Sequence, residues 1–284
     1  MKAIEIHNLT KKYEKFTLDS IDLEIPSGII VGLIGENGAG KTTLIKSILS
    51  IIKVDSGEVK IFGKDYKKEE ARIKEEIGVV LDNMFFPEIL KVKDIDSIMK
   101  SSYQNWDSEL YFQYLKEFDI PSNQQIKKLS KGMRKKLEIV TALSHHPKLL
   151  ILDEPTSGLD PVVRSEVLDI FLNFIQDEEH TILLSTHITS DLEHIADHIV
   201  FIDGGKKVLD KNRDDILDYY GILKCSKEEL EKIEKEDILS LKKNRYECEV
   251  LVDDITKMKK KYKDYVIDKI TLEELMVLMI KGEK

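Results

Sequence analysis

The order of hydrophobic patterns along the chain predicts an α/β fold. Short continuous apolar runs occur at 29–34, 77–81, 149–152 and 181–185, and each has the length of a β-strand. The run at 29–34 is rich in branched residues, as expected of a strand buried on both faces. Helical spacing of apolar residues follows the first run at 42–52 and the third near 162–175. Strands that alternate with helices in this way favour a parallel sheet.

Three other stretches have different patterns. Residues 1–28 contain two alternating strands, closed by a turn at 26–28. Between about 82 and 146, strand signals vanish and helical spacing predicts a helical subdomain. After a hairpin at 199–209, strand-like and helix-like segments alternate again, and the last helix opens with a capping box at 271–274. We therefore expect one domain over residues 1–210 and a small accessory α/β domain over 211–284.

Composition and charge narrow the class of protein. With 284 residues and 42% apolar content, the chain can build one large domain and a smaller one. The charged, alternating N-terminus is no signal peptide, and no apolar run approaches the ~18 residues of a membrane helix. We therefore expect a cytoplasmic protein that acts at a membrane only through a partner. A net charge of −9 argues against nucleic acid as the main partner, because binding to phosphates needs clustered Lys and Arg.

The two cysteines, Cys225 and Cys248, have no histidines nearby. They predict neither a zinc site nor a disulfide in a reducing compartment.

The glycine-rich stretch after the first buried strand carries the first candidate chemistry. Gly35, Gly38 and Gly40 allow the backbone to turn tightly, so that successive N–H groups can point into one concavity that holds polyphosphate. Lys41 supplies positive charge for the β and γ phosphates, and the Thr42 hydroxyl is placed to coordinate Mg²⁺. The pattern GxxxxGK[ST], with a strand before it and a helix after it, predicts a nucleoside triphosphate site.

Charged residues follow two further predicted strands. Asp153 and Glu154 end the strand at 149–152, at the edge where open α/β sheets bind their ligands. A carboxylate pair in this position suggests a cation, so Asp153 would hold Mg²⁺ while Glu154 polarises the attacking water. His187 follows the strand at 181–185 at the same edge, within reach of the γ phosphate and Glu154, although a lone histidine after a strand is also often structural.

Two other positions are compatible with nucleotide contacts. Ser130 can cap a helix whose first turns contain Lys131, Arg134, Lys135 and Lys136. The helix dipole disfavours positive charge there, and an anion at this helix end would explain the arrangement. Tyr13, in a lysine-rich turn, is either an ordinary surface aromatic or stacks on a purine.

The motifs follow one another in the order P-loop, helical insertion, LSKGM, LDEP, SGLD and STH. A chain with this order of motifs resembles the ATP-binding subunit of an ABC (ATP-binding cassette) transporter, and the resemblance covers residues 1 to about 210. The resemblance implies a P-loop NTPase (RecA-like) core with an antiparallel β subdomain and a helical subdomain, and it implies ATP and Mg²⁺ as ligands. It also implies a role for each matching residue. Tyr13 would be the aromatic that stacks on adenine, Ser130 and Gly132 would be the signature residues, and Asp160 would be the D-loop residue. Asp153 would be the Walker B residue, Glu154 the catalytic glutamate and His187 the switch histidine. The Walker A residues would be Gly35, Glu36, Asn37, Gly38, Ala39, Gly40, Lys41, Thr42 and Thr43.

The resemblance further implies two protein partners. Ser130 and Gly132 would contact ATP held by the opposite subunit of a head-to-tail dimer, which closes over two ATP molecules. Closure would drive a separate transmembrane permease, so the chain would be peripheral on the cytoplasmic face of the cell membrane.

Two positions depart from the family pattern. Asp82 stands where the family usually has a glutamine that touches Mg²⁺. A carboxylate can still ligate the ion, but it adds negative charge and cannot donate a hydrogen bond. The signature reads LSKGM in place of LSGGQ, so Lys131 either contacts phosphate or faces solvent. Both departures resemble exporters of the ABC-2 type, which expel peptides, antibiotics or lipid-like compounds.

Three functions are compatible with these observations. The leading one is an ATPase that powers an exporter. The second is a soluble ABC ATPase without a permease. Translation factors with two cassettes and repair proteins with a long coiled coil do not match this chain, whereas a cofactor-assembly ATPase would have the same architecture. The third, motivated by Asp82, is a regulatory cassette that binds ATP without hydrolysing it.

Overall fold

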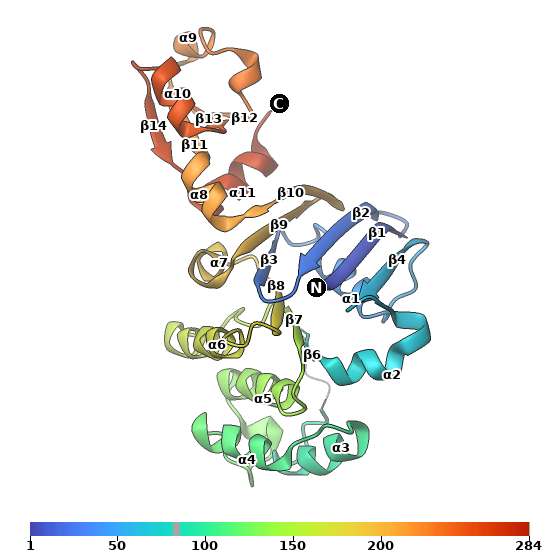
Figure 1. Ribbon diagram of the computed structural model, residues 1–284. Helices are drawn as coiled ribbons and strands as arrows, with labels where there is room; N and C mark the ends of the chain where they lie inside the picture. The colour runs from blue at the N-terminus through green and yellow to red at the C-terminus, as the bar shows by residue number, and fades with distance from the viewer. Residues whose placement is uncertain (82–85, 284) are drawn as a thin grey trace.

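Two sheets form the middle of the molecule, with a group of helices at one end and a smaller third sheet at the other (Figure 1). The computed structural model describes residues 1–81 and 86–283. Asp82, the predicted magnesium ligand, lies outside the described residues. Within them, no helix combines the length and the apolar character that crossing a membrane requires.

The six-stranded sheet is the parallel sheet that the apolar runs predict. Its order is β10-β9-β3-β8-β7-β6, and only the edge strand β10 is antiparallel to its neighbour. Every residue of β3, β7 and β8 is buried, which explains their continuous apolar sequences. Its strands are β3 (Ile30–Ile34), β6 (Ile77–Val80), β7 (Leu149–Asp153), β8 (Thr181–Ser185), β9 (His198–Asp203) and β10 (Lys206–Asn212).

The second sheet is antiparallel, with the order β2-β1-β4-β5. Its strands are β1 (Lys2–Lys12), β2 (Thr17–Pro26), β4 (Ser56–Ile61) and β5 (Lys64–Asp65). The buried apolar side chains of β1 and β2 share one cluster with α1 (Lys41–Ile48) and with one face of the six-stranded sheet. Helix α1 is therefore buried between two sheets, which fixes its first turn relative to the end of β3.

Helices form the end of the molecule that contains residues 86–143. Helix α2 (Tyr66–Glu76), which is kinked at Glu69, leads to β6. The helices beyond it are α3 (Asp94–Ser102), α4 (Ser108–Glu117), the short 3-10 turn η1 (Ile126–Lys128) and α5 (Lys131–Leu143). They surround their own apolar cluster, in which the buried Tyr111 hydroxyl donates to the Val92 carbonyl at 2.9 Å. The helical spacing of this segment is thus confirmed.

The face of the six-stranded sheet opposite α1 is covered by α6 (Pro161–Phe174) and α7 (Thr189–Ile195). After β10 the chain forms the third sheet, with the order β12-β13-β11-β14. Its elements are α8 (Arg213–Tyr219), β11 (Gly221–Cys225), α9 (Lys227–Leu230), η2 (Lys235–Asp237), β12 (Ser240–Lys243), β13 (Cys248–Val252), α10 (Ile255–Lys261), β14 (Val266–Lys269) and α11 (Leu272–Lys281). Cys225 and Cys248 face each other across β11 and β13, and both are free thiols.

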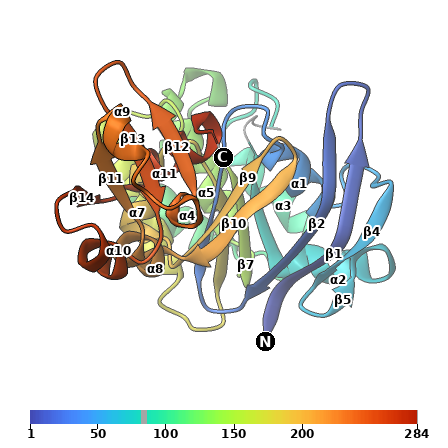
Figure 2. The same ribbon diagram turned by 90° about the horizontal axis from the view of Figure 1, so that it is seen from above.

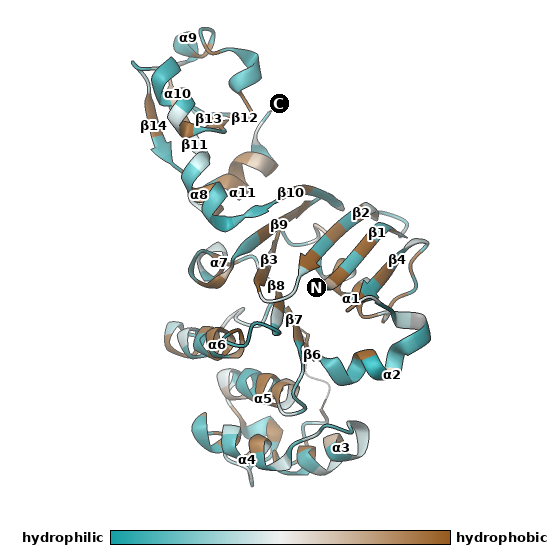
Figure 3. Cartoon of the chain, viewed as in Figure 1, coloured by the Kyte–Doolittle hydropathy of each residue, from teal (hydrophilic) through white to brown (hydrophobic). Residues whose placement is uncertain are grey.

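The apolar core does not stop where β10 ends. Helix α11 opens with the predicted capping box, in which Thr271 and Glu274 exchange hydrogen bonds. Its buried leucines belong to the same apolar cluster as Leu192 and Ile195 of α7. In Figure 2 the C-terminal elements lie on the side of α7, away from the antiparallel sheet. Figure 3 shows apolar residues along the sheet strands and on α11, and polar residues over α8 and α9. The C-terminal region is therefore packed onto α7.

Candidate functional site

A pocket of about 680 Å³ lies at the carboxyl edge of the six-stranded sheet. Four segments of the chain form it, namely the β1–β2 turn, the loop after β3 with the start of α1, the end of β7 with the loop that follows it, and the second residue after β8. Most of the predicted site residues meet here. The lining residues are Tyr13, Lys15, Phe16, Glu36, Asn37, Gly38, Gly40, Lys41, Thr42, Thr43, Asp153, Glu154, Ser157 and His187.

Glycine is required at both ends of the loop between β3 and α1. A Cβ atom at Gly35 would lie 2.3 Å from the Ile202 carbonyl oxygen, far inside van der Waals contact. Gly40 has a φ of 118°, and a Cβ there would lie 2.9 Å from the Phe16 ring. Gly35 and Ala39 are not among the lining residues, and Ala39 is 5% exposed. The loop is therefore shaped by close backbone approach, as its sequence predicts.

The first turn of α1 is a favourable place for an anion. The helix begins at Lys41 without a side-chain cap and without an acidic residue in its first turn. The Lys41 side chain is buried, and its Nζ donates to the Gly35 carbonyl at 2.6 Å and lies 3.7 Å from Glu154 Oε1. Burial lowers the pKa of Lys41, and the nearby carboxylates only partly oppose this. Uncapped N–H groups, the helix dipole and a desolvated cation together fit a bound polyphosphate.

The two acidic residues after β7 have different partners. Asp153 is 1% exposed, and its Oδ1 accepts a hydrogen bond from Ser185 Oγ at 2.5 Å. Glu154 leaves the strand with a φ of 52°, while its N–H still donates to the Ser185 carbonyl at 3.0 Å. This left-handed turn separates the two carboxylates, so that Asp153 faces β8 and Glu154 faces His187.

His187 reaches Glu154, as its place after β8 suggested. Its Nδ1 lies 2.7 Å from Glu154 Oε2, and the imidazole is 44% exposed. The turn that follows is closed by the Ile188 N–H, which donates to Thr186 Oγ1 at 2.9 Å, and α7 then begins at Thr189. The position of His187 thus depends on both β8 and α7.

A buried carboxylate ties α7 to the segment that follows Glu154. Asp191 is 1% exposed and accepts hydrogen bonds from Thr156 Oγ1 at 2.6 Å and from Arg164 Nε at 2.5 Å. Arg164, on α6, also donates to Ser190 Oγ at 2.7 Å. These hydrogen bonds therefore connect residues 154–160 to both α6 and α7.

Three predicted site residues lie away from the pocket. Ser130 caps α5, as predicted, by accepting from the Met133 N–H at 3.1 Å. Asp160 caps α6 by accepting from the N–H groups of its first turn, each at 3.1 Å. A Cβ at Gly132 would lie 2.9 Å from the Val163 side chain, so the first turns of α5 and α6 are in close contact. None of these three residues lines the pocket.

The positive charge at the start of α5 has partners that the sequence did not reveal. Arg134 pairs with Glu88 at 2.7 Å, Lys135 pairs with Glu138 at 2.8 Å, and Lys136 pairs with Glu166. Lys131 is exposed and lies against Gly158. The charge of these turns therefore does not by itself require a bound anion, because carboxylates of the protein already neutralise most of it.

Sequence reasoning missed several residues at the site. Phe16 and Lys15 line the pocket beside Tyr13, which is 48% exposed. The centroids of the Tyr13 and Phe16 rings lie 6.5 Å apart. The aromatic spacing of these two residues was a usable signal. Ser185, which holds Asp153, had a weaker one, since only the register of β7 with β8 places the two residues opposite each other.

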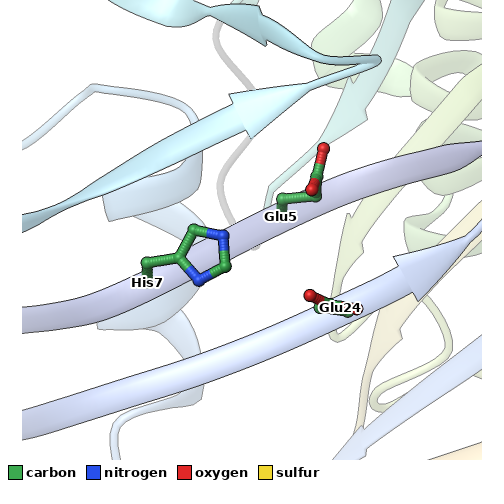
Figure 4. A group of neighbouring side chains, drawn as sticks. All are labelled: Glu5, His7 and Glu24. Atoms are coloured by element: carbon green, nitrogen blue, oxygen red, sulfur yellow. The ribbon is translucent and has the colours of Figure 1, made fainter.

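A second group of potential metal ligands lies outside this pocket. Glu5 and His7 on β1 and Glu24 on β2 offer ligand atoms within 4.8 Å of one another (Figure 4). The Lys2 ammonium group lies 2.8 Å from the Glu24 carboxylate and 3.3 Å from that of Glu5. Because this ammonium group already pairs with both carboxylates, we assign no metal ion to the group.

Comparison with known proteins agrees with this geometry. The family model described as ABC transporter matches residues 18–157. The lantibiotic transport ATP-binding protein SrtF of Streptococcus pyogenes is 35% identical over 214 residues, which are 74% of this chain and 91% of that protein. The bacitracin transport ATP-binding protein BcrA of Bacillus licheniformis is 34% identical, over 72% of this chain and 67% of that protein. The uncharacterized ABC transporter ATP-binding protein YhcH of Bacillus subtilis is 28% identical over 98% of this chain and 91% of that protein.

Solved structures give the same result for the fold. An ATP-binding subunit of an ABC transporter superposes with a TM-score of 0.66 at 27% identity, over 75% of this chain and 91% of that one. The cbiO1 protein of Clostridium perfringens, part of the ABC transporter complex cbiONQ, gives a TM-score of 0.63 at 26% identity, over 74% and 88% of the two chains. The chain therefore belongs to the ABC transporter family, as one of its ATP-binding subunits.

Proposed function

We propose that this chain uses the pocket at the end of β3 to bind and hydrolyse ATP, and that it thereby drives a separate permease which exports its substrate. The observation that carries the proposal is the meeting of the buried Lys41, Glu154 and His187 at the uncapped first turn of α1. ATP hydrolysis is the activity of the family to which the chain belongs. The assignments to individual residues are ours.

The phosphates of ATP would lie at the start of α1. There the N–H groups of the loop and of Lys41, Thr42 and Thr43 are donors, and the Lys41 ammonium group would exchange its carbonyl partners for phosphate oxygens. Tyr13 and Phe16 offer two aromatic faces at the opposite side of the pocket, where a base can stack.

The oxygen donors of the site suit Mg²⁺. The Thr42 hydroxyl and the Asp153 carboxylate are hard oxygen ligands of the kind that this ion prefers, and Asp153 is held in place by Ser185. When bound, the ion would neutralise phosphate charge. Asp82 is proposed as a third ligand on the basis of the sequence alone.

Glu154 is the proposed general base. Its carboxylate faces the pocket, and hydrogen bonding to His187 fixes its orientation, so that it can accept a proton from the attacking water. His187 would also reach the γ phosphate. Phosphoryl transfer to water needs little covalent chemistry, so positioning and charge neutralisation by these residues would supply most of the rate enhancement.

A second subunit would complete the site. Ser130, Gly132 and Asp160 lie outside the pocket of their own chain, at the adjoining first turns of α5 and α6. We infer that these turns close over the nucleotide of a second ATPase subunit in a head-to-tail dimer. Among the described cations at the start of α5, the exposed Lys131 is the one without a carboxylate partner, because Arg134, Lys135 and Lys136 are paired. Lys131 would therefore be available to the γ phosphate of the second subunit.

Export is supported by the relatives, whose names assign lantibiotic transport to SrtF and bacitracin transport to BcrA. We therefore propose a peptide or peptide-like substrate that a separate transmembrane permease recognises. The subunit would be peripheral on the cytoplasmic face of the membrane. We also propose the division into an ATPase domain over residues 1–210, with a helical subdomain at about 82–146, and an accessory domain over 211–284.

Two measurements test the proposal. The purified chain, alone and with its permease, should release phosphate from ATP with Mg²⁺ present and should stop when EDTA is added, while Lys41→Ala should be inactive. Affinity purification from detergent-solubilised membranes should bring down a polytopic membrane protein. An active enzyme that recovers no membrane protein would overturn the transport role, and a wild type that remains inert with its partner would overturn the catalytic one.

A further inference from the structure

Helix α7 stands between His187 and the C-terminal region. It begins two residues after His187 and runs along β3, where its fully buried Leu192 fills the space left by Gly32. A Cβ atom at Gly32 would lie 2.6 Å from Leu192 Cδ1, so α7 sits directly on the strand that leads into the P-loop. On this side there is no free space between helix and sheet.

The opposite side of α7 is held by α11. The N–H of Leu272, the first residue of α11, donates to Glu193 Oε1 at 2.7 Å. This N–H is one of the helix donors that have no partner inside the helix, and the dipole of α11 favours a carboxylate at that place. The Glu193 carbonyl also accepts a hydrogen bond from Arg213 Nη1 of α8 at 3.2 Å.

Apolar contacts accompany this bond. Three leucines on one face of α11 are buried in the same cluster as Leu192 and Ile195 of α7. They are Leu272 and Leu275, with no exposed area, and Leu278, with 2%. Helix α7 is thus clamped between β3 and α11, while Asp191 ties its first turn to Thr156 and Arg164.

These anchors matter because α7 is short. A helix of seven residues has little stability of its own, so its position is set by the groups that pack on it. His187 is joined to α7 by a single residue, Ile188, and its 2.7 Å contact with Glu154 depends on where α7 lies.

We propose that α11 is a positioning element for His187, and that Glu193 is the positioning residue through which the C-terminal region sets the rate of ATP hydrolysis. This inference rests on the catalytic role proposed above for His187 and gives the region after residue 210 a function. Glu193 does not touch the nucleotide pocket, so its effect would fall on turnover and leave ATP binding unchanged.

The test compares three substitutions in the full chain. Glu193→Ala should lower kcat by up to about 100-fold, which a displacement near 1 Å of a catalytic group can cost. The affinity for ATP, measured by equilibrium binding, should stay the same because the first turn of α1 is untouched. Glu193→Gln keeps an oxygen acceptor for the Leu272 N–H and should recover most of the turnover. Glu273→Ala, an exposed residue on the same turn of α11, is the matched control and should be normal.

A double-mutant cycle decides whether Glu193 acts through His187. Single-turnover rates of His187→Ala and of His187→Ala with Glu193→Ala should be equal, because residues that act as one unit are not additive. If Glu193→Ala lowers the rate in both backgrounds by the same factor, the inference is overturned. If His187→Ala alone hydrolyses ATP normally, the proposed role of His187 is lost instead.

Hydrogen exchange separates positioning from general destabilisation. In Glu193→Ala, peptides covering 187–195 should exchange faster, while those covering α1 and β7 should not change. Uniformly faster exchange across the chain, with a matching fall in thermal stability, would show a merely structural role. Unchanged exchange in 187–195 together with normal turnover would equally overturn the proposal.

Discussion

Replacing Glu154 by glutamine should separate hydrolysis from nucleotide binding. Glutamine has nearly the same shape, and the turn at Glu154 is held by a backbone hydrogen bond to Ser185, so the fold of the loop should persist. The amide nitrogen or oxygen can still meet His187, but the amide cannot accept a proton from water. The substitution therefore removes the general base and, with it, the negative charge beside Lys41.

The size of the effect follows from the contacts of the carboxylate. A positioned general base contributes ~10²–10⁴ in rate, which raises the barrier by about 2.7–5.4 kcal/mol when it is removed. Glu154 also lies 3.7 Å from Lys41 Nζ, and at an effective dielectric constant near 20 this gives an attraction of about 4.5 kcal/mol before the cost of desolvation. Without that carboxylate, Lys41 has one anionic competitor fewer for phosphate. ATP affinity should therefore stay equal or rise while turnover collapses.

The assay measures kcat by phosphate release and Kd by equilibrium binding of MgATP, with size-exclusion chromatography to detect an ATP-bound dimer. Glu58→Gln, an exposed carboxylate on β4 with 62% of its side chain accessible, is the control and should leave all three unchanged. Turnover within tenfold of the wild type would refute the role of Glu154. Loss of turnover in parallel with loss of ATP affinity would refute the separation of the two functions.

Three further predictions concern the frame around the site. Gly35→Ala places a methyl group 2.3 Å from the Ile202 carbonyl, so it should lower the free energy of unfolding by ~1–3 kcal/mol and weaken ATP binding, and an unchanged thermal midpoint would contradict this. Asp160→Ala removes the cap of α6 and should cost ~1 kcal/mol in urea denaturation, whereas Asp160→Asn should cost little. The hydrogen bond to Asp210 raises the pKa of His198 in the folded protein. The stability that protonated His198 contributes is therefore complete below its unfolded-state pKa of about 6.5 and is lost as the pH rises through its folded-state pKa. The stability difference between wild type and His198→Asn should therefore shrink from pH 6 to pH 9, and a difference independent of pH would disprove it.

Local patterns allowed much of the fold to be predicted. The run at 181–185 matches β8 residue for residue, because a strand buried on both faces needs an uninterrupted apolar sequence. The P-loop was equally clear, since glycines, lysine and threonine must follow one another along the chain to surround a phosphate. The capping box at Thr271 and the cap at Ser130 each span only three or four residues and could be predicted directly from the sequence.

Features that depend on distant partners could not be read in this way. Glu88 and Glu166 neutralise the start of α5 from other elements, so the cations alone suggested an anion. The short polar strand β12 has no apolar alternation to mark it, and it is recognised only by its pairing with β13. The link between Glu193 and Leu272 joins residues 79 positions apart, which no local pattern reports.

The apolar seam between α7 and α11 bears on how this protein can be handled. A chain shortened to residues 1–210 would lose the leucines of α11 and the last two residues of β10, leaving Leu192 and Ile195 beside newly exposed apolar surface. Such a patch promotes self-association, so the shortened chain should be poorly soluble and prone to aggregate during purification. A loss of ATPase activity in the shortened chain would then reflect aggregation and not the loss of a catalytic group. Point substitutions between α7 and α11 keep the apolar surface covered, so the activity of those variants can be measured.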